Sequence, residues 1–191
     1  MPSLALSIFA PLDMNTKNIE FKARVSSLAP YENKLLTLSP RFEGLDHQVD
    51  TYFNVPNGRL KLREGNIENA LINYNRADTA DAKLSDIILY HHQPDAALKA
   101  ILKLQLGIKA VVDKKRKIYF INHIKFHFDE VDGLGTFIEV EVIDKNGNLT
   151  IEAMKKDCDH YFHFFNLQKT DLVDRSYSDL ILEKENVSKS F

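Results

Sequence analysis

Charged side chains recur at every second position of several short apolar segments. Side chains on a β-strand point alternately to its two faces, so each segment predicts a strand with one apolar and one charged face. Basic residues bind the oxygens of a polyanion, and paired carboxylates hold a divalent cation. If these strands share one sheet that curls on itself, they line a cavity holding both signs. The residues with this spacing are Asn18, Glu20, Lys22, Arg24, Arg59, Lys61, Arg63, Lys114, Arg116, Glu139 and Glu141.

The basic segment at residues 59–63 (RLKLR) is the strongest of these signals. Three cations on one strand face repel one another unless an anion or opposing carboxylates lie near them. An edge strand protected by its charge is the alternative interpretation. Lys114 and Arg116 lead into an apolar segment and would lie on the same strand face, whereas the same basic run in a loop would be a solvated cluster or a weak nucleic-acid patch. Tyr74 and Arg76 share one face of their segment and could add a donor and a cation.

The carboxylates Glu139 and Glu141 share one face of an apolar segment. Burying them unpaired would be costly, so they need either a metal ion or the cations of other strands. Asp129 is a third candidate acid. Glu20 and Lys22 would lie about 7 Å apart on one strand face, where a carboxylate can hold a cation beside a phosphate-binding ammonium. For that segment alone, a surface strand with alternating charges is the simpler interpretation.

The composition is that of a globular protein with room for one sizeable core. The chain has 191 residues, 44% of them hydrophobic and 27% charged, with a net charge of -2. That charge gives no overall attraction to nucleic acid or to an anionic membrane, so an anion site must come from local clusters. The single cysteine, Cys158, excludes an intrachain disulfide and fits a reducing compartment such as the cytoplasm. We expect its side chain to be a small buried hydrophobic group. Zinc and P-loop spacings are absent, and the seven histidines read as ordinary polar or packed residues.

The chain reads as one domain over residues 14–184, preceded by an N-terminal extension at residues 1–13. The extension lacks a basic start and a clear cleavage site, so we expect no signal peptide. No stretch is long enough to span a bilayer. We expect no nucleic-acid or membrane partner, and we leave open a homodimer.

The pattern predicts about eight strands, two or three longer helices and a short terminal one. Consecutive strands joined by tight turns favour an antiparallel sheet, and closing the sheet into a barrel removes its edges. We therefore expect an α+β fold, a closed antiparallel eight-stranded β-barrel with charged faces inward and helices covering an apolar outer surface. The expected strands are 17–26, 47–54, 59–64, 70–77, 84–92, 108–121, 123–130 and 136–144, and the expected helices are 28–39, 94–106, 149–166 and a short 176–184. The second of these helices has an apolar stripe of Ala97, Ile101 and Leu104, and Ser176 is the candidate N-cap of the last.

Taken together, these segments resemble the CYTH superfamily, the triphosphate tunnel metalloenzymes, which includes class IV adenylyl cyclases and thiamine triphosphatases. The hallmark of that superfamily is ExExK on the first strand, and here an amide, Asn18, replaces the first acid. The segments DTYF and GRLKLRE look most like the corresponding segments of class IV cyclase-like proteins. The stretches that match, in the family's order, are 18–22 (NIEFK), 48–53 (QVDTYF), 58–64 (GRLKLRE), 114–116 (KKR), 129–139 (DEVDGLGTFIE) and 175–177 (RSY).

The resemblance implies a tunnel that binds a triphosphate together with Mg²⁺ or Mn²⁺. Glu20 and Glu139 would be metal ligands, Glu141 and Asp129 supporting acids, and Asn18 could still offer its amide oxygen. Replacing an acid by Asn18 removes one negative charge, which puts a second metal ion in doubt. The residues expected to bind the substrate are Lys22, Arg59, Lys61, Arg63, Tyr74, Arg76, Lys114, Arg116 and Arg175, and among them Lys22, Arg63 and Arg116 are the expected catalytic residues.

The leading functional prediction is a metal-dependent enzyme similar to class IV adenylyl cyclase, which converts ATP to cyclic AMP and pyrophosphate. A triphosphatase that hydrolyses thiamine, nucleoside or inorganic triphosphate is the first alternative. The two reactions differ in which nucleophile is aligned, and no motif decides between them. The second alternative is a non-catalytic module that binds a phosphorylated ligand, and Asn18 is the residue that favours it.

Overall fold

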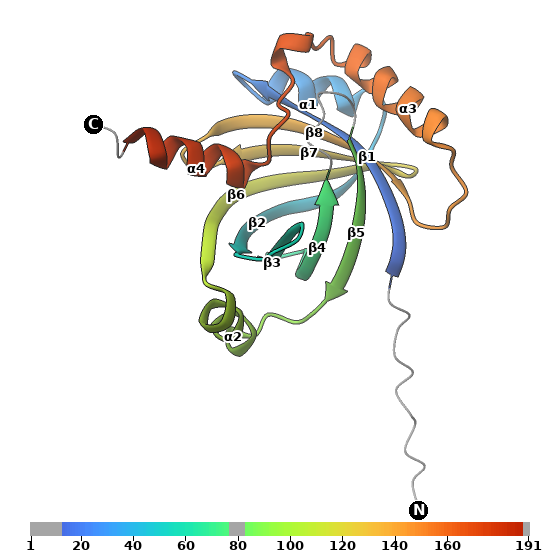
Figure 1. Ribbon diagram of the computed structural model, residues 1–191. Coiled ribbons are helices and arrows are strands. Elements are labelled where there is room, and N and C mark those ends of the chain that lie inside the picture. The colour runs from blue at the N-terminus through green and yellow to red at the C-terminus, as the bar shows by residue number, and fades with distance from the viewer. Residues whose placement is uncertain (1–12, 77–82, 189–191) are drawn as a thin grey trace, which may run out of the picture.

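The structure, a computed structural model, describes residues 13–76 and 83–188 of the chain, except for the side chains of residues 13–16, 76 and 83–86. Eight strands and four α-helices make up these ranges, with one short 3-10 helix (Figure 1). In chain order they are β1 (Asp13–Val25), α1 (Ala29–Leu36), β2 (Arg41–Phe53), β3 (Arg59–Glu64), β4 (Ala70–Arg76), β5 (Lys83–His91), α2 (Ala96–Leu106), β6 (Ile108–Ile121), β7 (Ile124–Val131), β8 (Gly135–Asp144), α3 (Ile151–Phe164), η1 (Lys169–Asp171) and α4 (Tyr177–Ser188).

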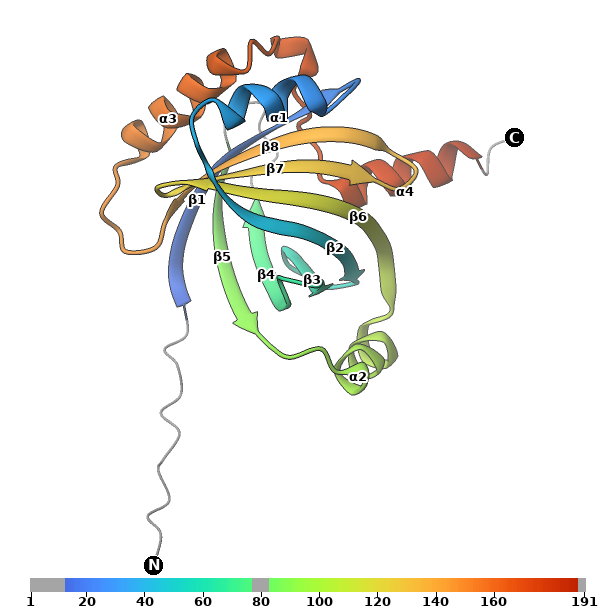
Figure 2. The same cartoon turned by 180° about the vertical axis from the view of Figure 1, so that it is seen from behind.

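The eight strands form one antiparallel sheet in the order β1-β5-β4-β3-β2-β6-β7-β8. β1 pairs along one edge with β5 and along the other with β8, so the order of neighbours returns to its starting strand. Figure 1 and Figure 2 show the resulting ring of strands from two sides. The predicted α+β class and the eight antiparallel strands are confirmed.

The larger hydrophobic core lies on the outside of this ring, as predicted from the inward charges. The outward residues of β1, which include Ile19 and Phe21, pack with the outward residues Phe126 and Phe128 of β7. The helices α1 and α3 lie side by side over this part of the sheet (Figures 1 and 2). Their contributions to the cluster include Leu35, Met154, Cys158 and Tyr161. Cys158 is buried there, and its thiol lies 3.4 Å from the backbone oxygen of Ile19.

A second hydrophobic cluster fills one end of the ring from within. Tyr52, Val112 and Phe137 each lie two positions from an inward-facing residue, Asp50, Lys114 and Glu139 respectively, so they share the inner face. Tyr177, the first residue of α4, packs against Phe137 with ring centroids 4.9 Å apart. The inner face is therefore charged over part of its length only, a feature that charge alternation alone does not reveal.

The predicted role of helix α2 is wrong in one respect. We expected Ile101 and Leu104 to cover the barrel, but these side chains are 58% and 80% exposed. The leucines of α2 that are half-buried are Leu98, Leu102 and Leu106, one to two positions away around the helix. Because Leu and Ile occur on both sides of this helix, its sequence does not identify the face that meets the barrel.

Within the described residues, no helix is both long and apolar enough to cross a membrane.

Most element boundaries agree with the prediction, and the exceptions have local causes. β2 begins at Arg41, whereas the prediction began it at residue 47. The earlier part of the strand was missed because Gly44, with φ of 147°, lies at an irregularity in the pairing with β6 and interrupts the strand pattern. Helix α2 begins at Ala96, where the Asp95 side chain accepts a hydrogen bond from the Ala97 backbone N–H, and not at residue 94. The predicted cap of α4 is confirmed, since Ser176 Oγ accepts from the Asp179 N–H at 3.2 Å.

Candidate active site

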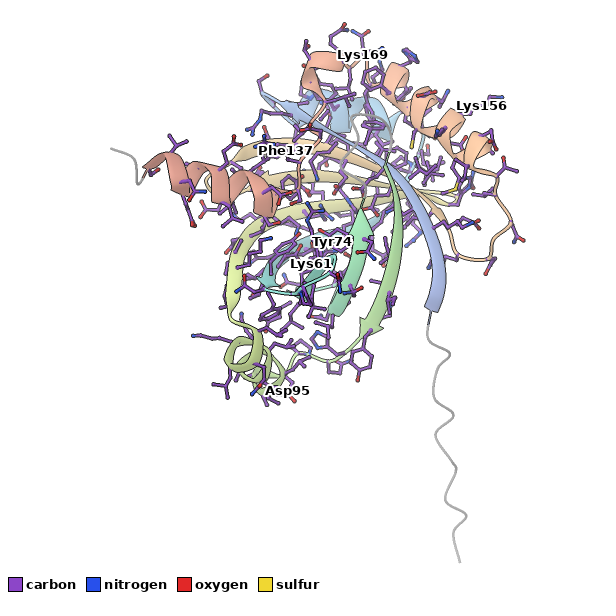
Figure 3. All side chains as sticks on the ribbon, in the orientation of Figure 1. Lys61, Tyr74, Asp95, Phe137, Lys156 and Lys169 are labelled. Atoms are coloured by element: carbon purple, nitrogen blue, oxygen red, sulfur yellow. The ribbon has the colours of Figure 1, made fainter. Side chains whose placement is uncertain are left out.

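A cavity of about 670 Å³ lies inside the ring of strands. In Figure 3 the labelled Lys61 and Tyr74 lie within this ring. The inner faces of β1, β2, β3, β6, β7 and β8 supply charged side chains to the cavity, and the turn between β3 and β4 adds one more. The charged residues that line it are Glu20, Lys22, Asp50, Lys61, Arg63, Glu68, Lys114, Arg116, Lys125, Glu139, Glu141 and Lys145.

Asp50 on β2 gathers three cations from β3 and β6. Its carboxylate oxygens accept hydrogen bonds from Arg63 Nε at 2.8 Å and Nη2 at 3.0 Å, from Lys61 Nζ at 3.0 Å and from Lys114 Nζ at 2.8 Å. Burial by itself would raise the pKa of Asp50, but Arg63, Lys114 and Lys61 hold it well below its ordinary value. Burial also lowers the pKa of Lys114 to about 7, against the opposing effect of Asp50. One carboxylate thus holds together three groups able to bind phosphate.

Arg116 on β6 joins the basic and acidic sides of the cavity. Asp129 accepts from Arg116 Nε at 2.7 Å and Nη2 at 2.5 Å, and Glu139 accepts from the same Nη2 at 2.7 Å. Lys22 Nζ lies 3.1 Å from the other oxygen of Glu139 and 4.2 Å from the centre of the Tyr177 ring. Burial opposes charge on Arg116, yet Asp129 and Glu139 raise its pKa well above the ordinary value.

Acidic side chains converge where β1, β7 and β8 meet. Glu20 pairs directly with Glu141 across β1 and β8. One ligand atom each of His127, Glu139 and Glu141 lies within 4.8 Å of the others, a spacing that could hold a metal ion. Burial raises the pKa of Glu141 to about 7; Lys125 opposes this, whereas Glu139 and Glu20 add to it. Burial likewise lowers the pKa of His127 to about 3.

The amide of Asn18 lies beside this acidic cluster. Its Nδ2 is 3.5 Å from Glu20 Oε2, and its Oδ1 is buried with no hydrogen-bond partner among the described residues. A buried carbonyl oxygen without a donor is costly, and a hard cation such as Mg²⁺ prefers oxygen ligands. The Asn18 oxygen could therefore serve as a ligand beside the group of His127, Glu139 and Glu141.

Glu68, in the turn between β3 and β4, reaches across the cavity. Its carboxylate accepts from Arg63 Nη1 at 2.8 Å on β3, and it forms an ion pair with Lys125 on β7. The turn is held by the fully buried Asp46, which accepts from the backbone N–H groups of Ile67 at 2.9 Å and Glu68 at 3.0 Å. Arg63 and Lys125, which both line the cavity, are thus already paired with a carboxylate of the chain itself.

The sequence model of the CYTH domain matches residues 16–177. The chain belongs to the CYTH domain family. No curated protein matches the chain in a sequence search.

Solved structures share this CYTH fold over most of the chain. A protein of Pyrococcus horikoshii is 26% identical, with a TM-score of 0.73 over 85% of this chain and 98% of its own. A Vibrio parahaemolyticus protein with the provisional name of adenylate cyclase is 18% identical, with a TM-score of 0.68 over 86% and 97%. A Hippeastrum protein, provisionally named adenylyl cyclase and described as revealing a dominant triphosphatase activity, is 12% identical, with a TM-score of 0.59 over 90% and 96%.

The cavity of this CYTH domain brings together most of the residues predicted from the sequence. They come from five strands that lie far apart in the chain. The predicted residues that line the cavity are Asn18, Glu20, Lys22, Lys61, Arg63, Tyr74, Lys114, Arg116, Glu139 and Glu141.

Four predicted residues lie elsewhere or are not described. Asp129 is buried but does not line the cavity, because Arg116 and the Tyr177 hydroxyl, which donates at 2.8 Å, surround its carboxylate. Arg59 is not among the lining residues, and its Nη2 lies 3.0 Å from Asp179 Oδ2 on α4. Arg175 is about half exposed and pairs with Glu183 outside the cavity. The side chain of Arg76 lies outside the described residues.

Sequence reasoning did not identify Asp50, Glu68, Lys125 and Tyr177, which line the cavity, or His127, which contacts Glu139 beside it. Asp50 continues the period-two series of Asp46 and Gln48, and Lys125 and His127 lead in steps of two to Asp129, so this period could have identified these three. His127 is a fully buried residue beside Glu139, whereas His91 and His92 line the cavity. Glu68 lies in a turn and Tyr177 begins a helix, so neither carries that signal.

Proposed function

We propose that this CYTH protein is a metal-dependent enzyme that cleaves a phosphoanhydride bond of a triphosphate. The observation that supports this most is the meeting of both charge signs in one cavity of about 670 Å³. A triphosphate with a divalent cation presents an anion to basic side chains and a cation to acidic ones. Separate basic and acidic surface patches would not serve such a ligand.

The proposed phosphate-binding groups are Lys22, Lys61, Arg63, Lys114 and Arg116. Each is buried or half-buried and is held in place by a carboxylate, so its position is fixed before a ligand arrives. Guanidinium groups have five N–H donors in a planar fork, which allows contacts with phosphate oxygens beside those made to the acids.

Lys22, Arg63 and Arg116 are the proposed catalytic residues. As a phosphoanhydride bond breaks, negative charge builds up on the leaving phosphate oxygens. Fixed cations in a site shielded from water stabilise that charge without having to reorient during the reaction. Asp129 is better placed as a positioning residue than as a supporting metal ligand, since its contacts hold Arg116 and Tyr177.

The proposed metal-binding residues are Asn18, Glu20, Glu139 and Glu141, whose oxygen donors suit Mg²⁺ or Mn²⁺. When bound there, the metal ion would neutralise phosphate charge and orient the phosphate chain. Glu139 also contacts Lys22 and Arg116, so the acidic and basic parts of the site are continuous.

Two reactions would use this site. In the first, the ribose 3′-hydroxyl of ATP attacks the α-phosphorus, and pyrophosphate leaves with formation of cyclic AMP. In the second, water attacks the terminal phosphorus and orthophosphate is released. We place the cyclase first because residues 50–53 (DTYF) and 58–64 (GRLKLRE) look most like class IV cyclase-like sequences. The Hippeastrum structure, which has the same fold and is described as revealing a dominant triphosphatase activity, is the reason to keep the second reaction beside the first.

A non-catalytic module that binds a phosphorylated ligand is the second candidate function. The observation that favours it is Asn18, an amide at a position where an acid would add negative charge for a metal ion. Such a module would bind triphosphate with the same cations but would not turn it over.

One experiment separates these functions. The full chain is incubated with Mg²⁺ or Mn²⁺ and either ATP or inorganic tripolyphosphate, and the products are separated by chromatography. Cyclic AMP with pyrophosphate would support the cyclase, and released orthophosphate the triphosphatase. Binding without turnover would support the module. The absence of both binding and turnover would refute the proposed function.

A further inference from the structure

One side of helix α2 is an apolar stripe that faces solvent. Ala97, Ala100, Ile101 and Leu104 follow one another along it at helical spacing, and all four are exposed. The half-buried leucines of the same helix lie on its other side, towards the barrel. A helix that is apolar on both sides is normally covered on both, and a contiguous exposed apolar patch marks an interaction site. The outer stripe of α2 is therefore a candidate docking surface.

Helix α2 lies at a corner of the molecule. Figures 1 and 2 show it apart from α1, α3 and α4, and Figure 3 shows Asp95 at the same corner. Ile108 and Val111, in the strand β6 that directly follows the helix, are 38% and 44% exposed. The apolar surface thus continues beyond the helix, and another macromolecule could approach it from outside.

The stripe is complementary in shape to a second copy of itself. In a twofold-symmetric pair, the same surface of both copies meets, and each contact occurs twice. If two α2 helices pack antiparallel about the midpoint between Ala100 and Ile101, then Ala97 lies opposite the partner's Leu104, and Ala100 opposite the partner's Ile101. Each large side chain meets an alanine, and this alternation of large and small residues allows close helix packing.

The charges of α2 favour the same arrangement. Asp95 caps the N-terminus of the helix, and Lys103 lies in its last turn. In the antiparallel pair, Lys103 comes within about 4.5 Å, measured along the helix axis, of the partner's Asp95, whereas a parallel pair would bring like charges together. Lys99 is paired with Glu64 of its own chain at 2.6 Å, so it adds little repulsion.

We propose that two copies of this chain form a twofold-symmetric dimer in which their α2 helices pack antiparallel along Ala97, Ala100, Ile101 and Leu104. The proposal is independent of the proposed function, because no residue of α2 lines the cavity.

Analytical ultracentrifugation of the full chain over a range of micromolar concentrations tests the proposal. We expect a reversible dimer. Leu104→Lys should weaken its association at least about tenfold, because it places a cation in the apolar contact with the partner's Ala97. Leu36→Lys is the matched control, since Leu36 is 48% exposed at the end of another helix, α1, and this variant should associate like the wild type. Circular dichroism checks that both variants fold.

Ala97→Leu distinguishes the antiparallel pairing from general apolar attraction. The change adds apolar surface to α2, but it fills the space that the partner's Leu104 needs, so the dimer should become weaker. Tighter association of this variant would overturn the proposed pairing.

A chain that stays monomeric at every concentration, or a dimer that Leu104→Lys leaves intact, would overturn the inference. Co-sedimentation of such a monomer with phosphatidylglycerol vesicles would assign the stripe to a membrane surface instead of a second copy.

Discussion

Lys22 on β1 and Glu139 on β8 are direct partners in the antiparallel pairing of these strands, and their side chains form a buried ion pair of 3.1 Å. The two residues are more than one hundred positions apart in the chain. Glu139 also contacts Arg116 on β6, so three strands meet at one carboxylate. A cavity containing both charge signs therefore follows from strand register, and predictions about single residues can be tested against it.

Arg63 should be a main contributor to triphosphate affinity. Arg63→Ala removes a guanidinium group that lines the cavity, and hydrogen bonds to charged groups contribute about 1.5–3 kcal/mol each, so affinity should fall about ten- to hundredfold. Calorimetric titration with tripolyphosphate measures the change. Arg175→Ala, which removes an exposed arginine outside the cavity, is the control and should leave affinity unaltered. An equal effect of both substitutions would argue against the assigned role of Arg63.

Glu139 should be needed for the metal ion more than for the fold. Glu139→Gln keeps the shape of the side chain but removes the negative charge that faces Lys22 and Arg116. We expect weaker Mn²⁺ binding, followed by electron paramagnetic resonance without triphosphate, and a loss of metal-dependent turnover. Glu130→Gln, an exposed residue of β7, should change neither. Wild-type Mn²⁺ affinity in Glu139→Gln would contradict the proposed metal site.

Lys114 should make triphosphate binding depend on pH. Burial lowers the pKa of Lys114 to about 7 in the free protein, and a bound anion nearby should raise it. Binding above pH 7 should then take up a proton on Lys114, and affinity should fall as the pH rises from about 7. Calorimetry in buffers of different protonation enthalpy counts the protons taken up. In Lys114→Met this uptake should decrease by up to one proton; an identical count in both proteins would show that Lys114 does not titrate with binding.

Glu68 should compete with the ligand for cations. Its carboxylate pairs with Arg63 and Lys125, both of which line the cavity. Glu68→Gln removes a competing negative charge, so triphosphate should bind more tightly by about fivefold, which corresponds to ~1 kcal/mol. Glu64→Gln is the control, because Glu64 pairs with Lys99 of α2. Weaker binding in Glu68→Gln would mean that Glu68 supports the site and does not compete for it.

Much of the fold could be predicted because the period-two pattern was long and regular. β3 (Arg59–Glu64) and β6 (Ile108–Ile121) begin and end where the alternation of charged and apolar residues predicts. The inward direction of the charged faces followed from the same alternation, and it placed the larger hydrophobic core outside the sheet, beneath α1 and α3.

The parts that were missed depend on contacts between distant segments. Glu68 reaches the cavity because buried Asp46 holds its turn, an arrangement that no local pattern reveals. In the sequence, the outward Ile101 and Leu104 look like core residues, because helix α2 has apolar side chains on both of its sides. The apolar pair of Ile72 and Leu89, which lines the cavity, becomes visible only once the register of β4 and β5 is known.

A crystal structure with a nonhydrolysable ATP analogue and Mn²⁺ tests the central claim most directly. We predict phosphates in contact with Arg63, Lys114 and Arg116, and anomalous density for Mn²⁺ beside Glu20, Glu139 and Glu141. Phosphates bound only on the outer surface, with the cavity holding water alone, would contradict the account.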